Sequence, residues 1–290
     1  CNADDSCPKV LETFGAAEFW NLRLSPNLVG TDARADIPLP PNLRRYYFPG
    51  VTHGGSWRGE FALHGDPAPA GAVACTLPLN PNPSAPTLRA LRRALVEWVS
   101  RGIEPPPSRY PTLAAGDLVA PEAAAMGWPA IPGVTVPDGK LNTLPDQWLG
   151  ARFSHADLSG VPGVLPPRLR GTIVQLVPRV DADGNETAGV PSVQLQVPIG
   201  TYTGWNERAS GFEKGRNCEL AGGFVPFART RAERLASGDP RASLEERYGD
   251  HAGFVARVRA AADRQVQDGW LSRADAARIL RQAEDSEVLR

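Results

Sequence analysis

The strongest constraint on the fold is a series of two strand-like segments and one long amphipathic helix within the first 101 residues. Residues 8–14 (PKVLETF) and 43–48 (LRRYYF) are short apolar or aromatic runs bounded by turn residues, as strands are. Residues 85–101 place Leu and Trp side chains at helical spacing and stop before Gly102. This series predicts an α/β fold in which the helix covers a sheet that contains both strands.

The rest of the chain predicts a loop-rich extension, because its 29 prolines and 29 glycines are spread along the sequence. Residues 103–170 are weakly periodic, and we expect an ordered excursion anchored by tryptophans. Residues 172–180 and 190–198 have strand-like character and flank the turn signal DADGN, which predicts a β-hairpin. Helices are expected towards the end of the chain, at about 227–236, 243–248, 251–267 and 273–284.

Composition excludes several classes of function. The formal net charge is −1, and no basic stripe indicates nucleic-acid binding. No apolar run approaches the ~20 residues that a membrane helix needs. No C-x-x-C pair indicates zinc. We therefore expect no metal, no cofactor, no nucleic-acid partner and no membrane partner, and the oligomeric state stays open.

The four cysteines bear on the compartment. Cys1 and Cys7 either form a small disulfide loop, as an exported protein would allow, or are free thiols, and the sequence favours neither. Cys75 and Cys218 are candidates for a second bridge. The chain starts with Cys1 rather than Met and shows no signal region. We expect that the chain is truncated upstream and that the absent segment carries part of the catalytic machinery. This fragment alone is therefore expected to be inactive.

The residues that carry chemistry lie just beyond the two predicted strands. Glu18 follows the first strand, and His53 follows the second in a Gly-flanked loop. Neighbouring strands of one sheet would bring these loops together, and a carboxylate that binds Nδ1 of an imidazole leaves Nε2 free as a general base. Asp32 is the second candidate for the acid, and Glu12 points off a sheet face within the strand. A surface-loop histidine and a helix-start carboxylate are the alternatives for His53 and Glu18.

No serine in the sequence occupies a G-x-S-x-G nucleophile elbow. Ser56 comes closest, with Gly54 two residues before it, but Arg58 stands two residues after it. Ser56 also follows the histidine, whereas the order in this type of site is serine, acid, histidine. We therefore expect the nucleophile to lie upstream, outside this chain.

An ordered series of modest motifs runs along nearly the whole sequence: CPKVLETFGAAEFW (7–20), PLPPNLRRYYFPGVTHGG (38–55), NPNP (80–83), LRALRRALVEWV (88–99), PPPSRYP (105–111), VDADGNE (180–186), PIGTYTGWN (198–206) and FVPFARTRAER (224–234). Together they resemble the C-terminal portion of a poorly characterised serine-hydrolase branch of the α/β-hydrolase family. The resemblance implies a Ser–Glu–His or Ser–Asp–His triad, with the histidine at His53 and the acid at Glu18. It also implies that residues 1–102 end the catalytic domain and that 103–290 form an extension packed on it.

The implied activity is transfer of an acyl group from a small ester-like substrate to water, and the exact substrate is not readable from the sequence. The alternative is a non-catalytic binding or accessory module on a hydrolase scaffold. Trp205 and Asn206 are candidates for lining a substrate cleft, although core packing is the favoured interpretation. Asp181 and Asp183 favour a turn over a calcium site, and His64, His155 and His251 are interpreted as surface or structural residues.

Overall fold

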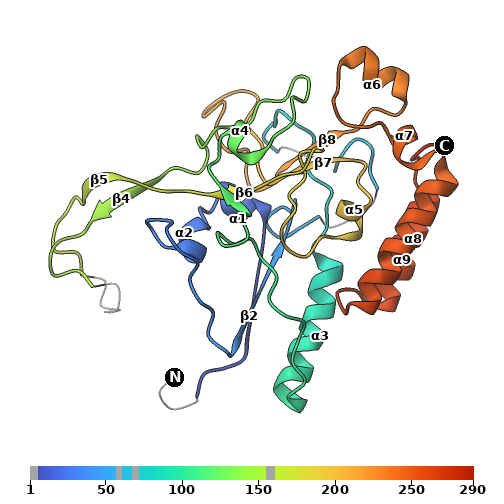
Figure 1. Ribbon diagram of the computed structural model, residues 1–290. Helices are drawn as coiled ribbons and strands as arrows, with labels where there is room; N and C mark the ends of the chain where they lie inside the picture. The colour runs from blue at the N-terminus through green and yellow to red at the C-terminus, as the bar shows by residue number, and fades with distance from the viewer. Residues whose placement is uncertain (1–5, 57–60, 67–71, 155–160) are drawn as a thin grey trace.

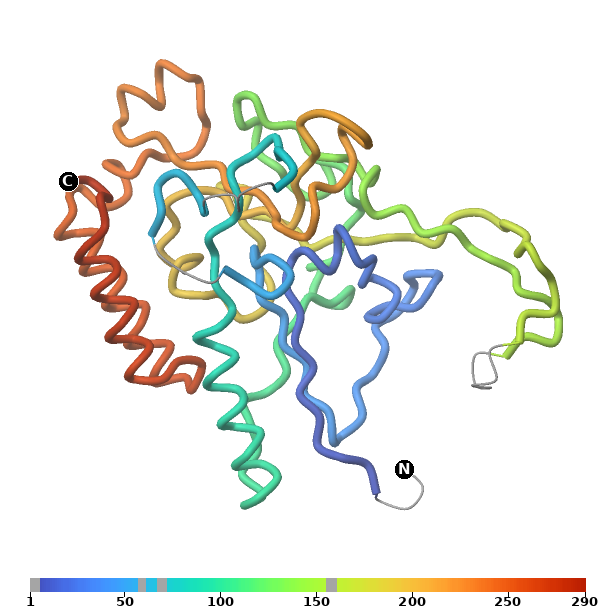
Figure 2. The backbone as a smooth tube through the Cα atoms, turned by 180° about the vertical axis from the view of Figure 1, so that it is seen from behind, coloured from blue at the N-terminus to red at the C-terminus, as the bar shows by residue number. Residues whose placement is uncertain are grey.

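In the computed structural model, which describes residues 6–56, 61–66, 72–154 and 161–290, two parallel strands organise the first part of the chain. Strand β1 (Val10–Gly15) pairs with strand β2 (Leu43–Phe48) in a continuous register that ends with Gly15 opposite Phe48. The two strands run side by side in both views (Figures 1 and 2). Both predicted strands are confirmed, and their carboxyl ends lie at the same edge.

Strand β2 is buried on both faces, as its aromatic composition requires. Its side chains alternate between two hydrophobic clusters, in keeping with the two-residue period of a strand. Tyr46 belongs to the cluster that contains Leu91 and Trp270, whereas Tyr47 belongs to the cluster that contains Phe19. The second edge of β2 is also occupied, because the Tyr47 amide donates to the Arg109 carbonyl (2.9 Å). The strand that leads to His53 is therefore held from every side.

Helix α3 (Ala85–Arg101) has the predicted bounds. Gly102 ends it with a left-handed backbone (φ 69°), a conformation that glycine adopts without a steric penalty. Leu91 and Trp98 are buried against the strands. Val99, next to Trp98 in the sequence, is 65% exposed, so the buried stripe of the helix is narrow.

The middle of the chain is irregular, with short elements that pair at a distance. These elements are β3 (Leu118–Val119), α4 (Ala123–Met126), β4 (Leu144–Trp148), β5 (Arg168–Ile173) and β6 (Val177–Pro178). Strands β4 and β5 pair antiparallel and form a ribbon that extends away from the rest of the molecule (Figure 1). Strands β3 and β6 also pair antiparallel and lie at the hydrophobic cluster that contains Tyr47.

The hairpin predicted from residues 172–180 and 190–198 is wrong. The second segment contains a helical turn, α5 (Val193–Gln196), in place of a strand. Ser192 caps this turn by accepting the Leu195 amide (3.0 Å), an interaction that favours helix over strand locally. The predicted DADGN turn does form, since the Gly184 amide donates to the Asp181 carbonyl (3.0 Å).

The C-terminal part is helical, as predicted. An antiparallel pair, β7 (Gly200–Thr203) and β8 (Gly223–Pro226), precedes the helices α6 (Arg231–Ser237), α7 (Leu244–Tyr248), α8 (His251–Gln267) and α9 (Arg273–Asp285). Helices α8 and α9 lie side by side along one flank (Figures 1 and 2). Their buried side chains, among them Phe254 and Ile279, join one cluster with Ile199 and Phe224 from the β7–β8 region.

Cys75 and Cys218 form the disulfide that was proposed as a second bridge, with Cα atoms 5.6 Å apart. Cys7 is also disulfide-bonded, and Cys1, its partner in one of the two interpretations that the sequence left open, lies outside the described residues. Within the described ranges, no helix has the length and apolar character needed to cross a bilayer. The domain boundary at residue 102 stays a prediction.

Candidate active site

Glu18 and His53 meet at the edge where β1 and β2 end. Oε1 of Glu18 lies 2.8 Å from Nδ1 of His53. The two side chains differ in exposure, since the Glu18 side chain is 14% exposed and the His53 side chain is 50% exposed. A largely buried carboxylate therefore contacts Nδ1 of an imidazole ring that is half exposed to solvent. This arrangement is the one that a general base requires.

The position of Glu18 follows from the start of helix α1 (Ala16–Trp20). Its second carboxylate oxygen, Oε2, accepts the Gly15 amide at 2.8 Å, so the side chain also caps the helix on which it lies. The Ala17 amide donates to the Val51 carbonyl (3.2 Å) and joins this helix to the histidine loop. Each of the two oxygens thus has a separate partner, and the helix-start role and the histidine contact are compatible.

The histidine loop leaves β2 through the Pro49–Gly50 turn. The backbone at Gly50 is left-handed (φ 61°), and a Cβ there would lie 3.1 Å from both the carbonyl oxygen and Cβ of Tyr202. Gly50 thus fits where a side chain would be strained and crowded. Further on, the His53 amide donates to the Leu220 carbonyl (3.3 Å). A segment far along the chain therefore fixes the backbone of His53 itself.

The other acids and histidines named from the sequence lie elsewhere. Glu12 pairs with Arg45 (2.5 Å), and the Asp32 side chain is 61% exposed and near Arg34. His251 contacts the Val288 carbonyl through Nδ1 (2.8 Å), which fits the structural role expected for it. His64 is exposed, and His155 lies outside the described residues.

Trp205 and Asn206 are buried, with 3% and 2% exposure. The Trp205 ring packs against two other tryptophans in the Tyr47 cluster. The Asn206 amide nitrogen donates to the carbonyls of Leu77 (3.0 Å) and Gly222 (2.9 Å). Both side chains therefore support the loops around the site, and their part in lining a substrate cleft stays a prediction.

Ser56 is the serine that comes closest to the elbow pattern in the sequence. Its hydroxyl donates to Oδ2 of Asp66 (2.6 Å), and the residue is buried. In the described part of the chain, no cluster of three or more His, Cys, Asp or Glu side chains could hold a metal ion.

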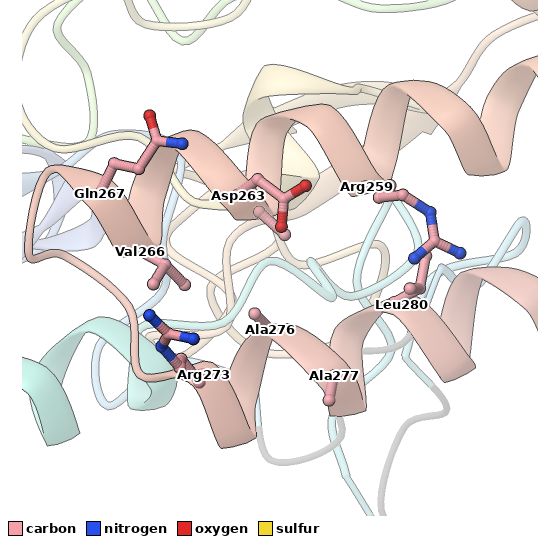
Figure 3. Close-up of a pocket in the computed structure, with 9 residues that line it drawn as sticks. Arg259, Asp263, Val266, Gln267, Arg273, Ala276, Ala277 and Leu280 are labelled. Atoms are coloured by element: carbon pink, nitrogen blue, oxygen red, sulfur yellow. The ribbon is translucent and has the colours of Figure 1, made fainter.

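A groove lies between α8 and α9 (Figure 3). Arg259 and Asp263 line it from α8, and Arg273 and Leu280 line it from α9. Neither Glu18 nor His53 takes part in its lining. The acid–histidine pair therefore lies at the strand ends, apart from this groove.

Sequence comparison places this geometry in a family. The family model described as alpha/beta hydrolase domain matches residues 1–281. The chain belongs to the alpha/beta hydrolase family. Searches of curated proteins and of solved structures found no match. Family membership indicates a hydrolase in general terms, and an alpha/beta hydrolase fits two parallel strands that carry an acid and a histidine at their carboxyl ends.

Three residues of this region were not identified from the sequence as parts of the site. Asn80 and Asn82 belong to the NPNP motif, and Glu186 ends the VDADGNE motif. All three are buried and bind the turn before His53. Their motifs were visible in the sequence, but nothing in the spacing showed that they meet.

Proposed function

We propose that this chain supplies the acid and the base of a serine-type hydrolase that acts on an ester-like bond. One observation carries the proposal: Glu18 and His53 lie 2.8 Å apart at the carboxyl ends of adjacent parallel strands. The nucleophilic serine would come from outside residues 1–290, since no serine here occupies a G-x-S-x-G motif.

In the proposed reaction, His53 acts as the proton carrier. The serine hydroxyl loses its proton to Nε2 of His53 as the serine oxygen bonds to the carbonyl carbon of the substrate. His53 then gives this proton to the leaving oxygen as the ester C–O bond breaks. Water repeats the sequence on the acyl-enzyme and releases the carboxylic acid and the free serine.

Glu18 has two roles in this proposal. By accepting a hydrogen bond from the Nδ1–H group of His53, it selects the tautomer that leaves the lone pair of Nε2 available. It also stabilises the imidazolium that forms in the transition state. Its contact with the Gly15 amide fixes the carboxylate, so the orientation does not have to be established in each turnover.

The test compares His53→Ala and Glu18→Gln with two matched controls in the full-length natural protein. Hydrolysis of p-nitrophenyl butyrate should fall on the order of 10⁴-fold in His53→Ala and on the order of 10³-fold in Glu18→Gln. His64→Ala alters an exposed histidine and Asp32→Asn alters an exposed acid, so both should keep wild-type rates.

Two outcomes would end the proposal. The first is a wild-type rate in His53→Ala. The second is a full-length sequence without a G-x-S-x-G motif after a strand, which would favour a binding or accessory module on the same scaffold.

A further inference from the structure

The Pro49–Gly50 turn between β2 and His53 is buried, and side chains from distant segments bind its backbone. The Asn80 amide donates to the Gly50 carbonyl (2.8 Å). The Asn82 amide donates to both the Pro49 carbonyl (3.1 Å) and the Gly50 carbonyl (3.0 Å). Oε2 of Glu186 accepts the Gly50 amide (2.7 Å). We call Asn80, Asn82 and Glu186 the polar frame.

Glu186 differs from the two asparagines because it binds both the strand and the turn. Its Oε2 atom accepts the Tyr47 hydroxyl at 2.6 Å as well as the Gly50 amide. Tyr47 is fully buried in β2, three residues before Gly50. One carboxyl oxygen thus fixes the position of the Pro49–Gly50 turn relative to the end of strand β2. A buried backbone amide needs such a partner, because leaving it unpaired is costly.

The turn that carries Glu186 is itself held in place. Oδ1 of Asp181 accepts the amides of Asp183 and Asn185 (both 2.9 Å). The Asn185 side chain accepts the Tyr202 amide (2.9 Å) and donates to the Gly200 carbonyl (3.1 Å). Glu186 therefore presents its carboxyl group from a turn fastened to strand β7, and it does not depend on the histidine loop for its position.

The geometry of the turn passes directly to the catalytic pair. Val51 follows Gly50 in the chain, and its carbonyl accepts the Ala17 amide in the helix that carries Glu18. His53 lies two residues further on. A change in the Gly50 backbone would therefore shift His53 relative to Glu18. A displacement on the order of 1 Å in such a pair can cost about 100-fold in rate.

We propose that Glu186 is a positioning residue that sets His53 against Glu18 through the Gly50 amide and the Tyr47 hydroxyl. This inference rests on the proposed function, because it assigns the buried carboxyl group to the same acid–base pair. It also assigns a role to the segment around Glu186, which lies more than 130 residues from His53 in the sequence. This segment fixes the orientation of the histidine loop.

The experiment measures catalysis and histidine geometry separately. In the full-length natural protein, Glu186→Ala should lower kcat for p-nitrophenyl butyrate about 10- to 100-fold with little change in KM. Glu186→Gln keeps an oxygen that can accept both bonds and should restore kcat to within about threefold of wild type. Tyr47→Phe removes one of the two bonds and should give a loss between these two.

A second readout does not need the nucleophile. In residues 1–290, long-range ¹H–¹⁵N NMR spectra report which nitrogen of His53 carries the proton. Wild type and Glu186→Gln should show the tautomer protonated at Nδ1, whereas Glu186→Ala should show a mixture of tautomers. Val258→Ala is the stability control, because it removes buried volume from the α8 core without touching the frame.

The outcomes separate the two proposals. A rate and a tautomer in Glu186→Ala that match those of Val258→Ala would overturn the positioning role while leaving the acid–base pair intact. A wild-type rate in His53→Ala would overturn the proposed function instead. Should Glu186→Ala not fold, Glu186→Asp replaces it, since it withdraws the carboxyl group from Gly50 by one methylene and should also lower kcat.

Discussion

The turn before His53 and the β4–β5 ribbon are built in opposite ways. The turn is buried, and its polar atoms bind side chains from two other segments of the chain. The ribbon extends from the molecule, and strand β5 is largely exposed (Figure 2). Its order comes from pairing with its own neighbour strand. The turn beside the candidate catalytic pair is thus fixed by long-range polar contacts, and the ribbon by local strand pairing.

This difference has an energetic reason. A buried polar group that loses its partner costs more than the net stability that a typical hydrogen bond provides. The polar frame is therefore sensitive to single changes, whereas solvent can replace partners in the ribbon. Because each alternative geometry would leave a buried polar group unpaired, the turn has one well-defined conformation. A catalytic histidine needs such a fixed position, and a surface ribbon does not.

The largest effect on stability is expected at Asn82, which is fully buried. Its replacement by Ala removes the partner of the Pro49 carbonyl and the acceptor of the Ser192 hydroxyl. We expect Asn82→Ala to lower the free energy of unfolding by about 3–4 kcal/mol, measured by urea denaturation. Asn27→Ala is the matched control, because Asn27 is exposed and its replacement should change the free energy of unfolding by less than about 0.5 kcal/mol. Equal losses of stability in the two variants would contradict the view that the polar frame is more sensitive to substitution than the surface.

A somewhat smaller effect is expected from the titration of Glu186. Burial raises the pKa of Glu186 to about 7 from its ordinary 4.5, so the folded protein holds this proton more tightly than the unfolded chain. Its contribution is complete below pH 4.5 and is lost as the pH rises through 7. The loss amounts to about 3 kcal/mol.

Urea denaturation between pH 4.5 and 8 tests this expectation. Glu186→Gln cannot titrate, so the stability of wild type relative to this variant should fall across that range. Asp239, Asp275 and Glu246 have pKa values that are lowered in the folded protein, so their contributions change below this window. A constant difference between wild type and Glu186→Gln would show that the carboxyl group does not titrate there.

The smallest effect is expected in the ribbon. Arg170 pairs with Asp146 across β4 and β5 at 3.0 Å, and the two side chains are 58% and 34% exposed. Solvent screens such a pair, so Arg170→Ala should change the free energy of unfolding by less than about 0.5 kcal/mol in urea denaturation and leave ester hydrolysis unaltered. A loss above 2 kcal/mol in the free energy of unfolding would mean that the ribbon is as sensitive to substitution as the polar frame.

Local patterns predicted the elements around the site well. Residues 43–48 and 85–101 combine a clear period with glycine or proline stop signals, and the observed β2 and α3 have the same bounds. Because β1 and β2 proved to be adjacent and parallel, the expectation that Glu18 and His53 lie together is met geometrically, while their catalytic roles stay a proposal.

Patterns of equal strength failed where tertiary contacts decided the conformation. Val193, Leu195 and Val197 alternate as in a strand, yet all three are buried around the helical turn α5. Burial on several sides removes the distinction between a strand period and an apolar run. Pro191 and Pro198 flank this segment and withhold backbone donors, a signal that favoured a non-strand conformation.

By itself, the sequence determined the strands and helix that surround the acid and the histidine, because periodicity, capping and stop signals act over a few residues. Only the tertiary structure decided which residues support them. Asn80, Asn82 and Glu186 lie about 30 to about 130 residues beyond His53, and they meet Gly50 because the chain folds back over the turn. A buried backbone amide always needs a hydrogen-bond acceptor, but only the packed fold determines which carboxyl group provides it.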